Sequence, residues 1–222
     1  MDACERDPAH AERQIYRMTQ SVAEFARKND AYLIALSTDA VSDGTIEYLC
    51  EDDDLNPVNV YGKVKVRTER YLAAEHETAM IVRTRFYGSN VVERPSFTEH
   101  VIRELGEGRD VNCFTDNYCT QIYVVNLAEI LAECMHIRPS GIYNIVEDEK
   151  FSRFGYAQLV ADVFGLDEKL IIPGSMADVE FLAPRPPDTS LSNRKIRGLI
   201  ETPISPAADG LARMKADLER WH

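Results

Sequence analysis

The sequence predicts an α/β fold in which helices connect parallel strands. Two apolar segments, 32–36 and 79–84, have the length and composition of buried strands, and helical patterns precede and separate them. Alternation of helix and strand favours parallel strands joined by right-handed crossovers. With 222 residues, 45% of them hydrophobic, the chain can form one large domain or two small lobes that share a core.

Local signals place the elements of the first half. Asp7 as N-cap and Pro8 as first helical residue predict the start of an amphipathic helix that ends near Asn29. A second helix is expected from Tyr61 to about Glu75, and a third over 96–105. The segment 112–120 is expected to be irregular. A short β-prone stretch over 121–125 then leads into a helix over 127–135.

The second half continues the alternation and then changes character. We expect a strand over 141–146, and a helix that Ser152 opens and Gly165 ends. Beyond Pro173 the chain is rich in proline, which indicates loops across a smaller lobe. A final helix is expected from about Pro206 to Trp221.

Two short motifs carry chemistry. Ser37-Thr38-Asp39 follows the strand 32–36, and Tyr61-Gly62-Lys63-Val64-Lys65 opens the second helix. Tyr61 and Lys65 are four residues apart and share a helix face, so the ammonium is expected to lower the pKa of the phenol. A hydroxyl of Thr38, or less favourably of Ser37, could bind the same substrate oxygen. The set predicts proton transfer at an alcohol or carbonyl oxygen while a cofactor moves hydride.

Charge and composition exclude several classes of function. A net charge of −12 argues against nucleic acid or an anionic membrane as partner. No apolar stretch reaches the length of a membrane span, and the N-terminus does not resemble a signal peptide. Five scattered cysteines show no metal-ligand spacing. We therefore expect a cytoplasmic protein with reduced thiols and no metal site.

The order of the motifs resembles one family. The run from Ser37 to Thr45, then Glu51-Asp52, then 57–65 and Glu69 are similar to the extended short-chain dehydrogenases/reductases of the dTDP-4-dehydrorhamnose reductase (RmlD-like) type. Further similar motifs lie along nearly the whole chain: Asp2-Ala3-Cys4-Glu5, Arg83-Thr84 with Tyr87-Gly88, Gly141-Ile142-Tyr143-Asn144, and Arg185-Pro186. The resemblance implies the C-terminal part of a Rossmann-type doubly wound sheet plus a small α/β substrate-binding lobe.

The resemblance also implies an activity, a reduction of the 4-keto group of a nucleotide-activated deoxysugar by NADPH or NADH. Tyr61 would donate the proton, Lys65 would hold the nicotinamide ribose, and Thr38 would bind the sugar carbonyl. The expected site residues are Tyr61, Lys65 and Thr38 for catalysis, Lys65, Tyr61 and Arg83 for the cofactor, and Ser37, Asp39, Arg185 and Arg153 for the sugar nucleotide. The implied organisation is a partial Rossmann-like domain over 1–110, a substrate lobe over 111–205 and a C-terminal helix over 206–222.

The sequence departs from the family in one large respect. It contains no G-x-G-x-x-G turn, which in dinucleotide folds lets the backbone approach the pyrophosphate. We therefore expect a piece of a longer protein that binds no NAD(P)H and is inactive by itself, or else a cofactor-free binding protein. If the family's strand order holds, the first four strands are absent and strand 32–36 is expected to expose a hydrophobic edge, where the chain could pair with a second copy or a partner protein.

Smaller departures and two other functions stay open. Ala40, Ser42 and Arg85 differ from the family pattern near the expected substrate, which leaves the identity of the sugar open. A regulatory subunit like that of methionine adenosyltransferase would explain the missing glycine turn, although the retained Thr38, Tyr61 and Lys65 speak against it. A sugar-nucleotide epimerase or dehydratase would keep the same Tyr/Lys pair.

Overall fold

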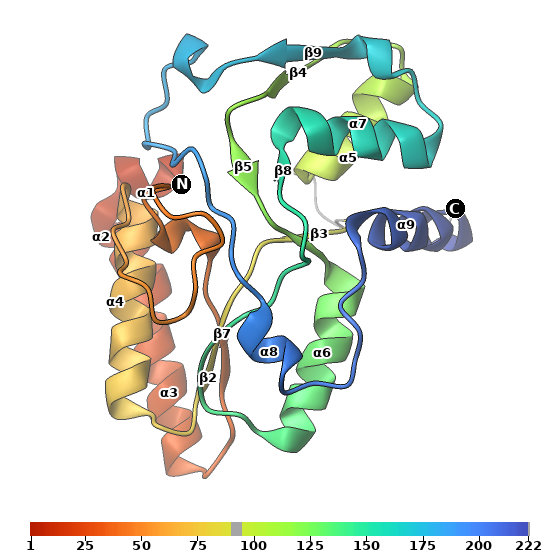
Figure 1. Ribbon diagram of the computed structural model, residues 1–222. Helices are drawn as coiled ribbons and strands as arrows, with labels where there is room; N and C mark the ends of the chain where they lie inside the picture. The colour runs from red at the N-terminus through yellow and green to blue at the C-terminus, as the bar shows by residue number, and fades with distance from the viewer. Residues whose placement is uncertain (90–94, 222) are drawn as a thin grey trace.

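The computed structural model describes residues 1–89 and 95–221, and a three-stranded parallel sheet forms the centre of one half of the molecule (Figure 1). The strands are β1 (Ile34–Leu36), β2 (Met80–Arg83) and β7 (Gly141–Asn144), in the order β1-β2-β7. Residues 90–94, within the predicted partial Rossmann-like domain 1–110, and His222, within the predicted C-terminal helix 206–222, lie outside the described residues. The parallel register confirms the predicted α/β class.

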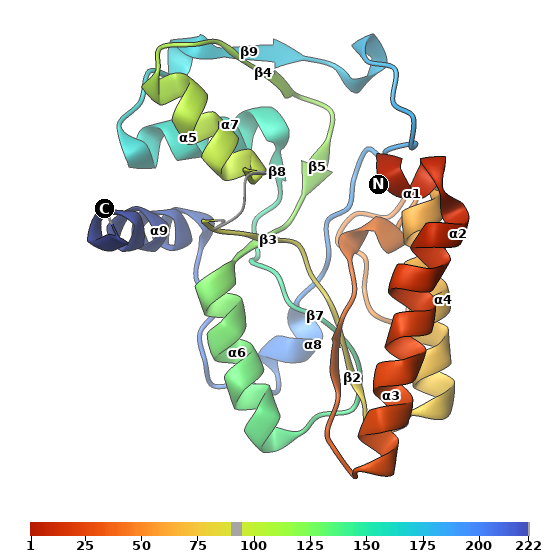
Figure 2. The same cartoon turned by 180° about the vertical axis from the view of Figure 1, so that it is seen from behind.

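Helices cover both faces of this sheet. On one face lie α3 (Met18–Lys28) and α4 (Val60–Glu75), and on the other lie α6 (Val124–Ile137) and α8 (Arg194–Arg197) (Figures 1 and 2). Side chains alternate across the sheet, so Ile81 packs toward α3 and α4 whereas Met80 and Val82 pack toward α6 and α8. The sheet is therefore doubly wound.

The N-terminal helices are nearly continuous. They comprise α1 (Asp2–Arg6), α2 (Pro8–Ala11), a π-helical segment η1 (Glu12–Arg17) and α3. The Asp7 carboxylate accepts a hydrogen bond from the His10 N–H at 2.8 Å, and Pro8 is the first helical residue. The predicted cap is confirmed. The predicted single helix is instead built from three successive helical segments that run from Pro8 to Lys28.

The other half contains short strands and three helices. Strand β4 (Val111–Phe114) pairs in parallel with β9 (Ile171–Gly174), and β5 (Tyr118–Cys119) pairs antiparallel with β8 (Phe151–Ser152). The expectation of an irregular 112–120 is wrong, because partners about 60 and 34 residues away in the chain supply the pairing that local sequence does not reveal. Between the halves, β3 (Phe86–Tyr87) pairs with β6 (Ile122–Tyr123).

Helices α5 (Phe97–Gly106), α7 (Arg153–Phe164) and α9 (Ala207–Trp221) complete this half (Figure 2). Ser96 and Ser152 cap α5 and α7, and Gly165 ends α7 in the left-handed conformation that favours glycine. The three helices share one apolar core with β4 and β9, formed by Val101, Leu105, Val111, Tyr156, Val160, Ile171, Leu211 and Met214 among others.

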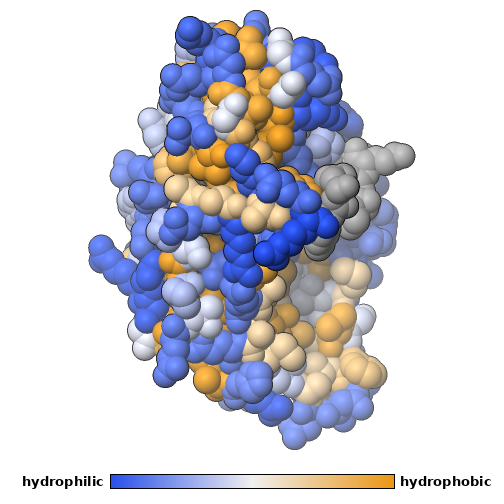
Figure 3. Space-filling model, turned by 90° about the vertical axis from the view of Figure 1, so that its right-hand side faces the viewer, coloured by the Kyte–Doolittle hydropathy of each residue, from blue (hydrophilic) through white to orange (hydrophobic). Residues whose placement is uncertain are grey.

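Strand β1 is the edge strand of its sheet, and Leu36 at its end is exposed. Met135 and Ile137 near the end of α6 are exposed as well. Figure 3, which views the molecule from the side of α6 and α9, shows apolar surface in its lower half.

Within 1–89 and 95–221, no helix is both long and apolar enough to cross a membrane.

Candidate active site

The predicted catalytic side chains gather at the carboxyl end of β1. Thr38 leaves the strand and caps the short 3₁₀ helix η2 (Asp39–Val41), while Asn59 caps α4 by accepting from the Gly62 N–H at 2.9 Å. Gly62 allows a close approach between the two. A Cβ there would clash with the Ala40 carbonyl oxygen and lie 2.7 Å from the Pro57 Cβ. This contact places Tyr61 beside Thr38.

Burial is the main cause of the pKa shifts of Tyr61 and Lys65. It raises the pKa of the Tyr61 phenol, and a hydrogen bond with the Thr38 hydroxyl opposes that shift only in part. Burial lowers the pKa of the Lys65 ammonium, which the Glu69 carboxylate counteracts. The Lys65 Nζ donates to the Leu36 carbonyl oxygen at 2.9 Å. The net shift of the Tyr61 pKa is thus upward, opposite to the lowering expected from Lys65, because burial, helped by the nearby Asp39 carboxylate, outweighs the hydrogen bond with Thr38.

Two other predicted residues, Arg83 and Ser37, both bind the Glu69 carboxylate behind this edge. Arg83 at the end of β2 binds the Glu69 carboxylate through Nε and Nη2, the latter at 2.8 Å, with 1% and 3% of the two side chains exposed. The Ser37 hydroxyl donates to the same carboxylate. Arg83 therefore has no surface left for the cofactor contact expected of it. The hydrogen of the Ser37 hydroxyl is likewise engaged by Glu69.

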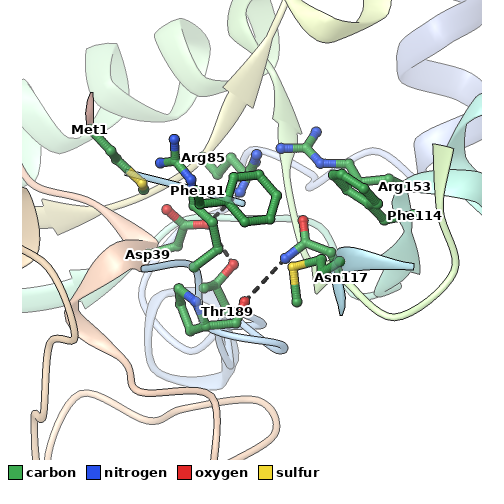
Figure 4. A pocket seen from close by; sticks show the side chains of 11 residues that line it. Met1, Asp39, Arg85, Phe114, Asn117, Arg153, Phe181 and Thr189 are labelled. Atoms are coloured by element: carbon green, nitrogen blue, oxygen red, sulfur yellow. Dashed lines mark hydrogen bonds and ion pairs between the residues drawn. The ribbon is translucent and has the colours of Figure 1, made fainter. Parts of the chain in front are cut away.

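A cavity of about 320 Å³ lies between this edge and the second half of the molecule (Figure 4). Asp39 is on one side and Arg153 with Phe114 on the other. The rings of Phe114 and Phe181 stack edge to face at 5.8 Å. Three arginines, Arg85, Arg153 and Arg185, line the cavity together with Asp39, Asn117, Thr189, Met1, Met176, Pro186 and the two phenylalanines. Three guanidinium groups around one cavity suit an anionic ligand, because each can bind a phosphate through two N–H groups.

Asp39 connects the cavity to the catalytic edge. Its Oδ1 accepts from the Thr38 hydroxyl at 3.1 Å, and its Oδ2 accepts from Arg85 at 2.9 Å and from the Thr189 hydroxyl at 2.7 Å. Tyr61, Thr38 and Lys65 are themselves not among the described residues that line the cavity. The structure thus brings Asp39, Arg153 and Arg185 to one cavity. Thr38 contacts Asp39 from outside the cavity, Tyr61 is hydrogen-bonded to Thr38, and Lys65 lies at the end of β1.

Comparison with models of protein families identifies the family of this chain. The model of the RmlD substrate binding domain matches residues 1–220. The chain belongs to this family. The predicted resemblance is confirmed, and the match covers nearly the whole chain, as the motifs indicated.

Individual relatives extend beyond the chain. The probable low-salt glycan biosynthesis reductase Agl14 of Haloferax volcanii is 26% identical over 220 residues, which are 97% of this chain and 73% of that protein. Methionine adenosyltransferase 2 subunit beta of Xenopus laevis is 25% identical over 163 residues, 70% of this chain and 48% of that protein. The chain thus spans about half of the latter.

Solved structures confirm the Rossmann-like fold. A dTDP-4-dehydrorhamnose reductase of Clostridium acetobutylicum superposes with a TM-score of 0.89 at 24% identity, over 98% of this chain and 77% of that one. The Bacillus anthracis dTDP-4-dehydrorhamnose reductase, solved in complex with NADP, gives a TM-score of 0.86 at 23% identity over 97% and 76%. At these identities the likeness shows the fold alone.

Sequence reasoning missed several residues of the cavity. Asn117, Phe181 and Thr189 come from loops without a motif, and their position depends on the pairing of β4 with β9 and of β5 with β8. Arg85, which the sequence placed near the expected substrate without a role, has a position that could have suggested one. It lies two residues beyond β2, at the same carboxyl edge of a parallel sheet where Thr38 follows β1, and ligands of open α/β sheets bind at this edge.

Glu147 is a second residue that the motifs did not reveal. It lies just beyond β7, is fully buried, and its Oε1 has no hydrogen-bond partner in the described part of the chain. Burial, helped by the Glu149 and Asp148 carboxylates, raises the pKa of Glu147 to about 9. Glu147 is therefore protonated in the folded protein at neutral pH.

This shift predicts a pH dependence of stability. The folded protein holds a proton that the unfolded chain releases above its ordinary pKa, so the stabilisation falls as pH rises toward 9. Between pH 5.5 and 8.5 the free energy of unfolding should fall by about 3–4 kcal/mol more in the wild type than in Glu147→Gln, measured by urea denaturation. Exposed Glu77→Gln is the control, because Glu77 is not among the groups that shift the pKa of Glu147. Equal pH dependence in wild type and Glu147→Gln would contradict the assignment.

Proposed function

We propose that the chain carries the catalytic edge and the sugar-nucleotide cavity of a reductase that acts on the 4-keto group of a nucleotide-activated deoxysugar. The observation that carries the proposal is the hydrogen-bonded link from the Tyr61–Thr38 pair, through Asp39, to a cavity lined by three arginines. Names of relatives, among them reductases of glycan biosynthesis and of dTDP-4-dehydrorhamnose, support the substrate class.

Residues of this chain suit one end of an NADPH or NADH cofactor. Tyr61 and Lys65 could hold the nicotinamide ribose, since Lys65 is half-buried at the open edge of β1. The sequence has no glycine-rich turn for the pyrophosphate, so these residues fit only that end. When bound, the cofactor supplies hydride to the sugar carbonyl carbon.

The chain's own residues would handle the proton and the phosphates. The raised pKa keeps the Tyr61 phenol protonated at neutral pH, the form required to donate a proton to the carbonyl oxygen as it becomes an alcohol. Thr38 would hydrogen-bond the same oxygen. From the segment 111–205, which we assign as the substrate lobe, Arg153 and Arg185 would bind the diphosphate across the cavity from Asp39.

Sugar-nucleotide binding tests this proposal directly. We expect dTDP-glucose to bind the wild-type chain in isothermal titration calorimetry and Arg153→Gln to weaken it by about 10- to 100-fold, since a hydrogen bond to a charged group is lost. Arg213→Gln is the matched control, because Arg213 forms a surface pair with Glu129 on α6 and α9. Equal affinity of wild type and Arg153→Gln would contradict the phosphate role.

A regulatory binding subunit is the second candidate. The similarity to methionine adenosyltransferase 2 subunit beta and the lack of a glycine-rich turn favour it. NADPH fluorescence titration and co-purification distinguish the two functions. Stable association with an unrelated enzyme, without ketosugar turnover in any complex with NADPH, would favour regulation.

A further inference from the structure

Arg85 lines the cavity, but the proposed function gives this side chain no role of its own. Its Nη1 donates to the Asp39 Oδ2 at 2.9 Å, and this is its single ion pair among the described residues. The side chain keeps 26% of its surface exposed and lines the cavity. A guanidinium carries five N–H groups, so Arg85 can still donate to a ligand.

Further hydrogen bonds to Asp39 fix the position of the Arg85–Asp39 ion pair. The Asp39 carboxylate, 6% exposed, also accepts from the Thr189 hydroxyl at 2.7 Å and from the Thr38 hydroxyl at 3.1 Å. Three donors on one carboxylate leave Arg85 and Thr38 little freedom relative to each other. Arg85 is thereby held at the end of the cavity nearest to the proposed catalytic hydroxyls.

The end of the cavity at Arg85 and the end at Arg153 and Arg185 differ in how far their positive charge is neutralised. Arg153 has no carboxylate partner in the ranges that the structure describes and lies over the Phe97 ring at 4.6 Å. Arg185 pairs with Asp2, but the Asp2 side chain is 45% exposed, against 6% for Asp39, so water screens this pair and it can yield to a ligand. Positive charge is thus more available at Arg153 and Arg185 than at Arg85, which the buried Asp39 carboxylate neutralises. A diphosphate suits the first pair, and an uncharged polar group suits Arg85.

We propose that Arg85 is a specificity-determining residue that donates a hydrogen bond to an uncharged hydroxyl or carbonyl oxygen of the sugar, while Asp39 holds the guanidinium in place. This inference rests on the proposed sugar-nucleotide site. It assigns a neutral sugar as the ligand, because the carboxylate of a uronic acid would face the Asp39 carboxylate across the same small space.

Calorimetric titration with dTDP, dTDP-glucose and dTDP-glucuronic acid tests the assignment without any need for turnover. Wild type should bind dTDP-glucose more tightly than the other two. Arg85→Gln should weaken dTDP-glucose by about tenfold or more and leave dTDP within twofold, since the lost hydrogen bond involves only the sugar. Asp39→Asn, which leaves the guanidinium charge unbalanced, should shift the preference toward dTDP-glucuronic acid.

Two further variants keep the test decisive. Arg153→Gln should weaken dTDP and dTDP-glucose alike, unlike Arg85→Gln. If Arg85→Gln alone folds poorly, as judged by circular dichroism, the double variant Arg85→Gln/Asp39→Asn, which removes both charges, replaces it and should show the affinities expected of Arg85→Gln. Equal losses for dTDP and dTDP-glucose in Arg85→Gln and in the double variant would overturn the inference alone. Failure of wild type to bind any of the three nucleotides would overturn the proposed function and this inference with it.

Discussion

Replacing Tyr61 with phenylalanine is expected to slow ketosugar reduction by about 10²- to 10⁴-fold, the usual contribution of a positioned proton donor. The phenol is beside Thr38, and burial keeps it protonated. Loss of the hydroxyl leaves the nascent alkoxide without its proton source, while packing of the ring is preserved. NADPH absorbance should be followed with a 4-keto-deoxysugar nucleotide, in a protein that joins these residues to a glycine-rich dinucleotide-binding half.

A tyrosine on the same helix provides the control. Tyr71 stacks edge to face on Tyr16 at 5.7 Å, on the side of α4 that packs against the N-terminal helices, and Tyr71→Phe should retain activity. Lys65→Met should also reduce turnover, through loss of the ammonium at the end of β1. Turnover of Tyr61→Phe within twofold of wild type would exclude Tyr61 as the proton donor and leave the binding function as the better account.

The parts of the fold that could be predicted are those with local causes. Asp7 and Ser152 cap the starts of helices with their side chains, and Gly165 terminates α7 through its backbone conformation, so sequence suffices to place these helix boundaries. Strands β4 and β5 owe their pairing to β9 and β8, far along the chain. Their existence depends on the tertiary fold, and sequence periodicity alone did not reveal it.

The candidate site divides in the same way. Thr38 and Tyr61 were predictable together because each sits at a recognisable junction, the end of a strand and the start of a helix. The cavity beside them combines Arg85, Asn117 and Thr189 from three separate segments. Arg83 shows the converse error, since a residue at the right edge of the sheet points into a buried ion pair rather than toward a ligand.

That buried pair gives the largest expected effect on stability. Glu69→Gln should lower the free energy of unfolding by about 3–5 kcal/mol, because the Arg83 guanidinium would keep its charge in the interior without a counter-ion. The Ser37 hydroxyl would also lose its carboxylate acceptor. Urea denaturation at neutral pH measures the change.

Two controls show whether the cost of Glu69→Gln comes from leaving the Arg83 charge buried or only from losing an ion-pair contact. Glu129→Gln breaks a pair with Arg213 in which both side chains are 42% exposed, and should cost at most about 1 kcal/mol. Glu69→Leu/Arg83→Met removes both buried charges and should recover much of the loss, since desolvation opposes the attraction within the pair. If Glu69→Gln cost no more than Glu129→Gln, Arg83 would have to reach solvent or another acceptor, and its side chain would again be available to a ligand at the end of β2.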